Sequence, residues 1–278
     1  MAFFSWETAE SLRKSAAKPI PRGMRGTIIR VMAAGVVCLA CGVEGANLSR
    51  EDRLRNQIEP ALAQDAIELR VNNTAFLALH RGAERMKRRG AVILLHDMEA
   101  NPATPNVIQP LRLGLPRHGW ETLSLQMPLA DRGAWRRAYI ALIPEALPRI
   151  DAAITWLKQR KAEHIVLLGY GTGARVAIAY AGARSGAPLL AVVAISLETD
   201  TAGLPPSIRR RLPLLDIFAG RDLRGVLATA PLRRRVAAER KHTGFRQIEI
   251  AGAGPTFRHF DDMLLRRITA WLSQQLPP

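Results

Sequence analysis

"HIVLLGYGTGARVAIAYAG", residues 164–182, contains an apolar run, a glycine-rich turn and a run of small residues. The apolar run is typical of a buried strand, and the small residues after it favour a helix that packs closely against that strand. A glycine-rich turn between such a strand and helix presents either a reactive side chain or a set of backbone N–H groups that binds an anion. The stretch therefore predicts an α/β architecture and the position of a site.

The turn fits the nucleophile elbow of hydrolases, Gly-x-Ser-x-Gly, except at its centre. Gly169 and Gly173 occupy the outer positions, and Gly171 stands where the serine is expected. Glycine has no side chain and cannot attack a carbonyl. Thr172 lies one position late, at a place where the backbone N–H serves the oxyanion hole. The hydroxyl of Thr172 as a shifted nucleophile is an alternative. The turn predicts an elbow without its usual nucleophile.

Other parts of a hydrolase site follow in the expected chain order. An upstream strand ends at Asp97, and the loop that begins with Asp97 and Met98 is where such enzymes supply a second oxyanion-hole N–H. Asp222 follows a later strand, at the position of the catalytic acid, and His259 precedes the last helix. We therefore take Asp97, Met98 and Thr172 as candidates for oxyanion or anion binding, and Asp222 and His259 as weak catalytic candidates.

The same turn also matches a dinucleotide-binding fingerprint, Gly169-x-Gly171-x-x-Ala174. Glu198 closes the next strand, where such proteins place the carboxylate that binds the ribose. Against this interpretation, at least two strands precede the turn, whereas the fingerprint normally opens its domain. Dinucleotide binding therefore remains a second alternative.

The chain from residue 47 to residue 278 alternates between strands and helices. Apolar runs at 90–97, 120–128 and 189–198 are typical of strands that are buried on both faces, and an apolar stripe predicts a helix at 143–160. Such alternation favours a mostly parallel sheet with helices on both faces. No linker interrupts it, so we predict one α/β domain over 47–278, entered by a helix at 50–64.

Residues 1–46 have the pattern of a leader and a signal peptide. Arg25 and Arg30 precede an apolar stretch at 31–43 that is too short to span a membrane, and small residues follow it. Both cysteines of the chain lie in this stretch, so the predicted domain has none. The pattern predicts export and a periplasmic or envelope-associated location in a bacterium.

The composition indicates a strongly basic protein with enough apolar residues for a full core. The 278 residues are 48% hydrophobic and carry a formal charge of +16. Eleven basic side chains between residues 207 and 246 are opposed by three carboxylates. This balance favours a small anionic ligand, an anionic envelope ligand or an anionic membrane surface as partner. No zinc-ligand spacing or aromatic–basic pattern is present in the sequence, so we expect no metal, no cofactor and no specific nucleic-acid partner.

Four segments resemble an uncharacterised bacterial family of exported α/β-hydrolase-like proteins. They are "GAVILLHDMEANPATPNVIQPLRLGLPRHGWETLSLQMP", "IPEALPRIDAAI", "IVLLGYGTGA" and "FRQIEIAGAGPTFRHFDDMLLRRITAWL". The resemblance runs from about Arg50 to the C-terminus, and it implies the α/β-hydrolase fold and an envelope location. It implies no defined biochemical activity.

The sequence departs from the hydrolase pattern at two further positions. Pro255 stands where the catalytic histidine usually falls, four residues before His259, and Asp97 replaces the glycine that usually follows a histidine such as His96. Enzymatic activity is therefore uncertain, because the members of a catalytic triad act as a unit. We predict a degenerate hydrolase-fold protein of the envelope that acts by binding. The alternatives are an active hydrolase of esters or amides with a non-standard nucleophile, and a dinucleotide-binding protein.

Overall fold

The computed structural model describes residues 45–200, 204 and 211–277. The predicted leader and signal peptide fall almost entirely on residues 1–44, outside the described residues, and remain a prediction. Within the described residues, no helix is both long enough and apolar enough to cross a membrane.

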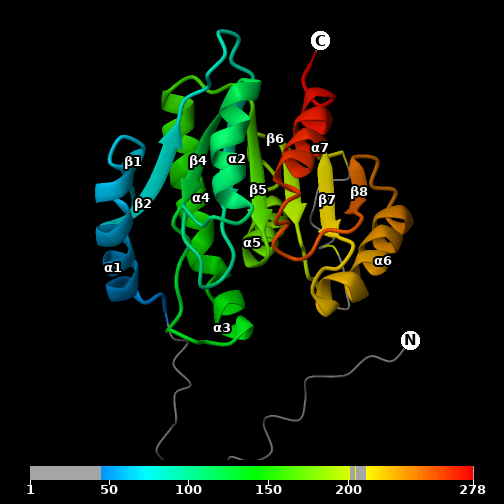
Figure 1. Cartoon of the computed structure of the whole chain (residues 1–278), viewed down its shortest axis with the longest axis horizontal. Coiled ribbons are helices and arrows are strands. Elements are labelled where there is room, and N and C mark those ends of the chain that lie inside the picture. The colour runs from blue at the N-terminus through cyan, green and yellow to red at the C-terminus, as the bar shows by residue number, and fades with distance from the viewer. Residues whose placement is uncertain (1–44, 201–203, 205–210, 278) are drawn as a thin grey trace, which may run out of the picture. The chain divides into compact units, whose positions relative to one another are not determined.

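Eight strands form a single mixed sheet in the order β1-β2-β4-β3-β5-β6-β7-β8 (Figure 1). β2 runs antiparallel to β1 and β4, and all pairs from β4 to β8 are parallel. The mostly parallel sheet predicted from the sequence is thus confirmed, with the antiparallel part at one edge. The strands are β1 Ala66–Val71, β2 Thr74–Arg81, β3 Gly90–Leu95, β4 Trp120–Leu125, β5 Ile165–Tyr170, β6 Leu189–Ile195, β7 Leu214–Ala219 and β8 Phe245–Ile250.

The helices fill the connections between these strands. They are α1 Leu48–Ile58, α2 Ile108–Gly114, α3 Arg136–Ala141, α4 Ile143–Gln159, α5 Thr172–Ala183, α6 Arg224–Glu239 and α7 Asp261–Ser273, with 3-10 turns at Pro60–Leu62 and Leu115–His118. The entering helix ends at Ile58, earlier than the predicted 50–64, because Pro60 has no N–H to continue the helical ladder.

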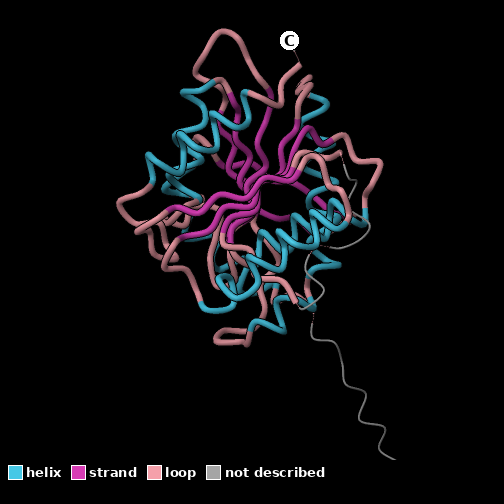
Figure 2. The backbone as a smooth tube through the Cα atoms, turned by 90° about the vertical axis from the view of Figure 1, so that its right-hand side faces the viewer, coloured by secondary structure: helices cyan, strands magenta, loops and turns pink. Residues whose placement is uncertain are grey.

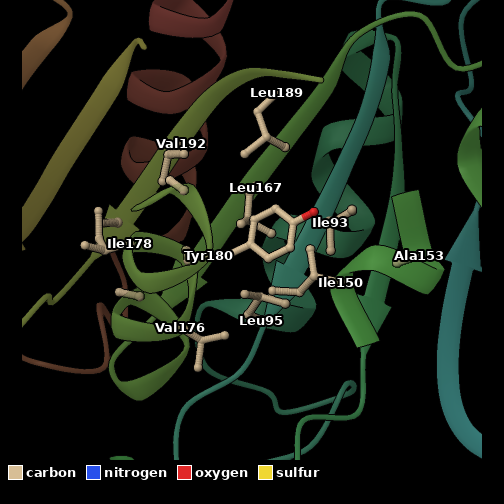
Figure 3. Close-up of a cluster of buried hydrophobic side chains, with 14 of the residues drawn as sticks. Ile93, Leu95, Ile150, Ala153, Leu167, Val176, Ile178, Tyr180, Leu189 and Val192 are labelled. Carbon is tan, nitrogen blue, oxygen red and sulfur yellow. The ribbon is translucent and has the colours of Figure 1, made fainter. Parts of the chain in front are cut away.

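The sheet separates two hydrophobic cores, and helices cover both of its faces (Figure 2). Side chains of α4, α5 and α6 pack on one face, and those of α2 and α7 pack on the other. Alternate residues of one strand point to opposite cores: Ile93 of β3 lies in the first, and Val92 lies in the second. Figure 3 shows part of the first core, where Tyr180 of α5 lies among aliphatic side chains. The Tyr180 hydroxyl donates to Asp151 of α4 (2.7 Å).

The carboxyl ends of the parallel strands meet at one edge of the sheet. The loops after β3, β4, β5, β7 and β8 therefore leave the sheet on the same side. Ligand sites in open parallel sheets lie at this edge. The predicted elbow and the loop that begins with Asp97 are neighbours there, because β3 and β5 pair directly.

Candidate functional site

The turn after β5 has the geometry of a nucleophile elbow. Gly171 adopts φ 58° and ψ −116°, a strained conformation that glycine tolerates best, and α5 begins at the next residue. A Cβ atom at Gly169 would lie 2.2 Å from the carbonyl oxygen of Gly173, and one at Gly173 would lie 2.2 Å from that of Leu95. Close backbone contacts therefore require glycine at 169 and 173, and the positive φ favours glycine at 171.

The carboxylate of Asp97 occupies the place where the chemistry of a hydrolase would occur. Its Oδ1 accepts hydrogen bonds from the backbone N–H groups of Thr172 (2.7 Å) and Met98 (2.8 Å). A Cβ atom on Gly171 would lie 2.3 Å from the Asp97 Cγ. One aspartate thus takes both the oxyanion position between two N–H donors and the space of the missing serine side chain.

His96 fixes the loop that carries this carboxylate. Its Nδ1 donates to the carbonyl oxygen of Asp97 (2.7 Å), and its Nε2 accepts from the N–H of Met127 (2.9 Å), so the neutral ring joins the ends of β3 and β4. Complete burial lowers the pKa of His96 from 6.5 to about 4, with the positive charge of Arg149 adding to this effect. The imidazole is therefore a neutral structural group at physiological pH.

The His96 ring is expected to remain neutral until the pH approaches 4. Since its pKa is lower in the folded protein than in the unfolded chain, the unfolded state binds the proton first, and the free energy of unfolding falls between about pH 6.5 and pH 4. A shift of this size corresponds to roughly 3 kcal/mol. NMR titration of the His96 ring protons measures the pKa directly, and a midpoint near 6.5 would contradict this assignment.

Asp222 lies at the position of the catalytic acid, after β7. Its Oδ2 accepts from the Ser196 hydroxyl (2.6 Å) and the Ala219 N–H (2.9 Å), and its Oδ1 accepts from the Leu223 N–H (2.8 Å). The carboxylate is buried, and donors from the protein hold both of its oxygens. No imidazole of the described residues is among these donors, and the three hydrogen bonds hold Asp222 against Ser196 after β6 and against the turn after β7.

The loop after β8 does not bring a histidine to the acid. His259 is exposed, with φ 66°, and forms none of the hydrogen bonds or ion pairs found among the described residues. The weak assignment of His259 as a catalytic base is therefore not supported. Pro255, at the usual histidine position, offers its carbonyl oxygen to the hydroxyl of Tyr170 (2.9 Å).

Tyr170 is a site residue that sequence reasoning missed. Burial raises the pKa of its phenol well above 10, and the negative charges of Asp97 and Asp222 raise it further. The neutral hydroxyl ties the elbow to the loop after β8. Its place directly before the central Gly171 was the only signal available in the sequence.

The cavity beside the elbow is too small for a substrate. Its volume is about 20 Å³, and it is lined by Asp97, Met98, Met127, Tyr139 and Thr172 together with their neighbours. This is room for about one water molecule, which needs roughly 10–15 Å³ by the same measure. Thr172 is buried in this lining, so the structure offers no room for an acyl group beside a threonine nucleophile.

The geometry favours an elbow over a dinucleotide loop. The N–H of Thr172, which would bind a pyrophosphate, already binds Asp97. Glu198 forms an ion pair with Arg136, and its carboxylate fills the space where Gly225 would carry a Cβ atom. In the part of the chain that the structure describes, no group of three or more His, Cys, Asp or Glu side chains could hold a metal ion.

The arginine-rich stretch does not form a single basic face. Arg233 is fully buried and forms an ion pair with Asp216, which is also buried. Arg240 binds the carbonyl oxygen of Leu204. Among the described residues of the stretch, seven basic side chains are exposed: Arg211, Arg221, Arg224, Arg234, Arg235, Lys241 and Arg246.

Comparisons with known proteins give a family and a fold. A model of a family described as "Protein of unknown function (DUF3530)" matches residues 40–147 and 144–274. A comparison with curated proteins found no match.

Several solved structures are similar to the chain. Est1E from Butyrivibrio proteoclasticus is 13% identical, with a TM-score of 0.59 over 76% of this chain and 98% of that one. The esterase Pf2001 from Pyrococcus furiosus is 17% identical, with a TM-score of 0.57 over 76% and 92%. An alpha-beta serine hydrolase homologue from Coxiella burnetii is 12% identical, with a TM-score of 0.55 over 73% and 96%. At these identities the likeness shows the fold alone, and the predicted α/β-hydrolase fold is confirmed.

Proposed function

The chain belongs to the family described as "Protein of unknown function (DUF3530)", and we propose that it has kept the α/β-hydrolase fold, lost acyl-transfer chemistry and acts by binding. We also propose that the protein acts in the bacterial cell envelope. The proposed loss of acyl-transfer chemistry rests on one observation above all: the carboxylate of Asp97 lies between the two N–H groups that would bind an oxyanion.

A fixed carboxylate at this position opposes hydrolysis in two ways. It competes for the donors that stabilise the tetrahedral intermediate of acyl transfer, and its negative charge repels the developing oxyanion. The elbow also lacks a nucleophilic side chain at Gly171, and no imidazole donates to Asp222. Because nucleophile, base and acid act as a unit, these losses together favour a binding role.

Two features of the sequence support the envelope location and an anionic partner. The basic and apolar pattern of residues 24–46 is that of an export signal. The exposed arginines offer attractive charge to an anionic lipid surface, an acidic envelope polymer or a small anionic ligand. We therefore place the binding role on the envelope side of the inner membrane.

The test combines location and activity. The full chain, expressed in a Gram-negative host, is expected in the fraction released by osmotic shock or in the membrane fraction. It is expected to show no turnover of p-nitrophenyl acetate above buffer and no labelling by a fluorophosphonate probe. Thr172→Ala, and Thr155→Ala on the exposed face of α4 as a matched control, should leave both readouts unchanged.

Three results would count against the proposal. Turnover that Thr172→Ala abolishes and Thr155→Ala preserves would indicate an active hydrolase with a threonine nucleophile. Recovery from the cytosol alone would contradict the envelope location. A rise in melting temperature with NAD would favour dinucleotide binding, because a ligand of the folded state stabilises it.

A further inference from the structure

A surface groove beside the degenerate elbow is large enough for a ligand. Its volume is about 350 Å³, within the range of roughly 300–1,000 Å³ typical of small-molecule sites. Arg50, Arg53 and Leu54 of α1 line it, together with Glu99 after β3 and Leu129 and Arg132 after β4. We call it the arginine groove. The groove shares the loop after β3 with the site at the elbow, since Glu99 is two residues beyond Asp97.

Arg50 is held in place by a dense set of contacts. Its guanidinium forms an ion pair with Glu99 and donates to the hydroxyl of Tyr139 (3.1 Å) and the carbonyl oxygen of Ala130 (2.7 Å). The Tyr139 hydroxyl in turn donates to Glu99 (2.5 Å). The hydrogen bond from Arg50 lowers the pKa of Glu99, and the same bond raises the pKa of Arg50. The Glu99 carboxylate therefore orients the Arg50 guanidinium.

The backbone of Glu99 indicates that its contacts with Arg50 and Tyr139 determine the local conformation. Its φ of 58° lies in the left-handed region, which costs a residue other than glycine about 1 kcal/mol or more. Such a conformation persists where the surrounding contacts determine it, and here those contacts are Arg50 and Tyr139. Tyr139 also lines the small cavity at the elbow. Because its hydroxyl contacts Arg50 and Glu99, Tyr139 lies between that cavity and the groove.

Arg53 and Arg132 supply charge that is not neutralised within the groove. Both are exposed, and neither forms an ion pair or a side-chain hydrogen bond with any residue that the structure describes. The nearby Asp131 accepts a hydrogen bond from Asn47 and is not among the lining residues. The lining thus has three guanidinium groups against one carboxylate, with an excess of two positive charges.

We propose that the arginine groove binds a phosphate monoester group, with Arg53 and Arg132 on the phosphate oxygens and Leu54 against the apolar substituent. Guanidinium groups match the geometry of phosphate oxygens, and a dianion matches the excess charge. The proposal specifies the ligand class for the binding role proposed above. A soluble phosphate monoester and the head group of phosphatidic acid share this chemistry.

The full chain is titrated with phenyl phosphate by isothermal titration calorimetry, and separately with vesicles of phosphatidylcholine with and without phosphatidic acid. We expect binding that weakens as salt is added. Arg53→Gln and Arg132→Gln should each weaken binding by about tenfold, as expected for loss of a charge-assisted hydrogen bond. Arg266→Gln and Arg267→Gln on α7 remove the same charge outside the groove and outside the arginine-rich stretch, and they should leave binding unchanged.

Each outcome decides a different point. Binding of phenyl phosphate that the groove variants weaken supports a soluble ligand, and the same dependence with phosphatidic-acid vesicles alone supports a lipid. No binding of either probe, or equal losses in the groove and α7 variants, would overturn the proposal. The ester assay is independent of this titration: an active protein would refute the loss of hydrolase chemistry without affecting a measured site in the groove.

Discussion

Gly171→Ser is expected to lower the free energy of unfolding by about 3 kcal/mol or more, although serine is the usual residue of an elbow. Two costs add. The serine Cβ would lie 2.3 Å from the Asp97 Cγ, so the Asp97 carboxylate would have to leave its hydrogen bonds to the N–H groups of Thr172 and Met98. The backbone at φ 58° and ψ −116° also strains any residue with a side chain. Chemical denaturation of the variant and the parent protein measures the difference.

Removal of the Asp97 side chain should reduce this cost. In an Asp97→Gly background the same serine substitution is expected to cost at least about 1 kcal/mol less, because residues in contact do not contribute additively. Gly186→Ser is the matched control, since no atom lies within 4 Å of a Cβ atom at Gly186, and it should change stability by no more than about 0.5 kcal/mol. Strict additivity between positions 97 and 171 would show that the carboxylate does not fill the serine site.

The double variant is not expected to hydrolyse esters. It would restore the serine and free the N–H groups of Thr172 and Met98, but no imidazole would accept the serine proton. The Asp222 carboxylate would still accept hydrogen bonds from Ser196, Ala219 and Leu223. The structure retains the glycine turn of an elbow, whereas no histidine of the described residues donates a hydrogen bond to Asp222.

The sequence predicted the fold well because the elbow is specified locally. Gly169, Gly171 and Gly173 lie within five positions, and each meets a backbone atom that excludes a side chain or adopts a conformation that disfavours one. Alternation of apolar runs then predicted the parallel strands. β1 was missed, because Glu68 and Arg70 make this edge strand polar on one face and its apolar run short.

The occupied oxyanion hole could not be predicted in the same way. Asp97 and Thr172 are 75 positions apart, and their contact depends on the pairing of β3 with β5 and on the turn of one loop. The sequence showed that Asp97 replaces a glycine, which put the oxyanion hole in doubt. It gave no reason for the carboxylate to lie within the hole. The sequence shows that Asp97 follows His96 in place of a glycine, but it does not show the direction in which the Asp97 side chain points.

Arg233 shows a signal that was present in the sequence and was not used. It was counted among surface arginines, yet Val226, Ala230, Arg233 and Ala237 recur at helical spacing and are all buried on α6. Its guanidinium donates from Nε and Nη2 to the two oxygens of Asp216 (2.8 and 3.2 Å). Gln247 of β8 donates to the same carboxylate (2.7 Å), so the pair joins β7, β8 and α6.

Arg233→Met is therefore expected to lower the free energy of unfolding by about 3–5 kcal/mol, because it leaves the Asp216 charge buried with only one neutral partner. Asp216→Leu combined with Arg233→Met should recover most of that loss, since apolar side chains can replace a buried ion pair. Arg235→Met, two residues along the same helix, is the matched control. Arg235 is 68% exposed and pairs with Glu239 at 3.6 Å, so its loss should cost no more than about 1 kcal/mol. Urea unfolding of the four proteins distinguishes these cases, and similar losses for Arg233→Met and Arg235→Met would show that Arg233 is not buried in solution.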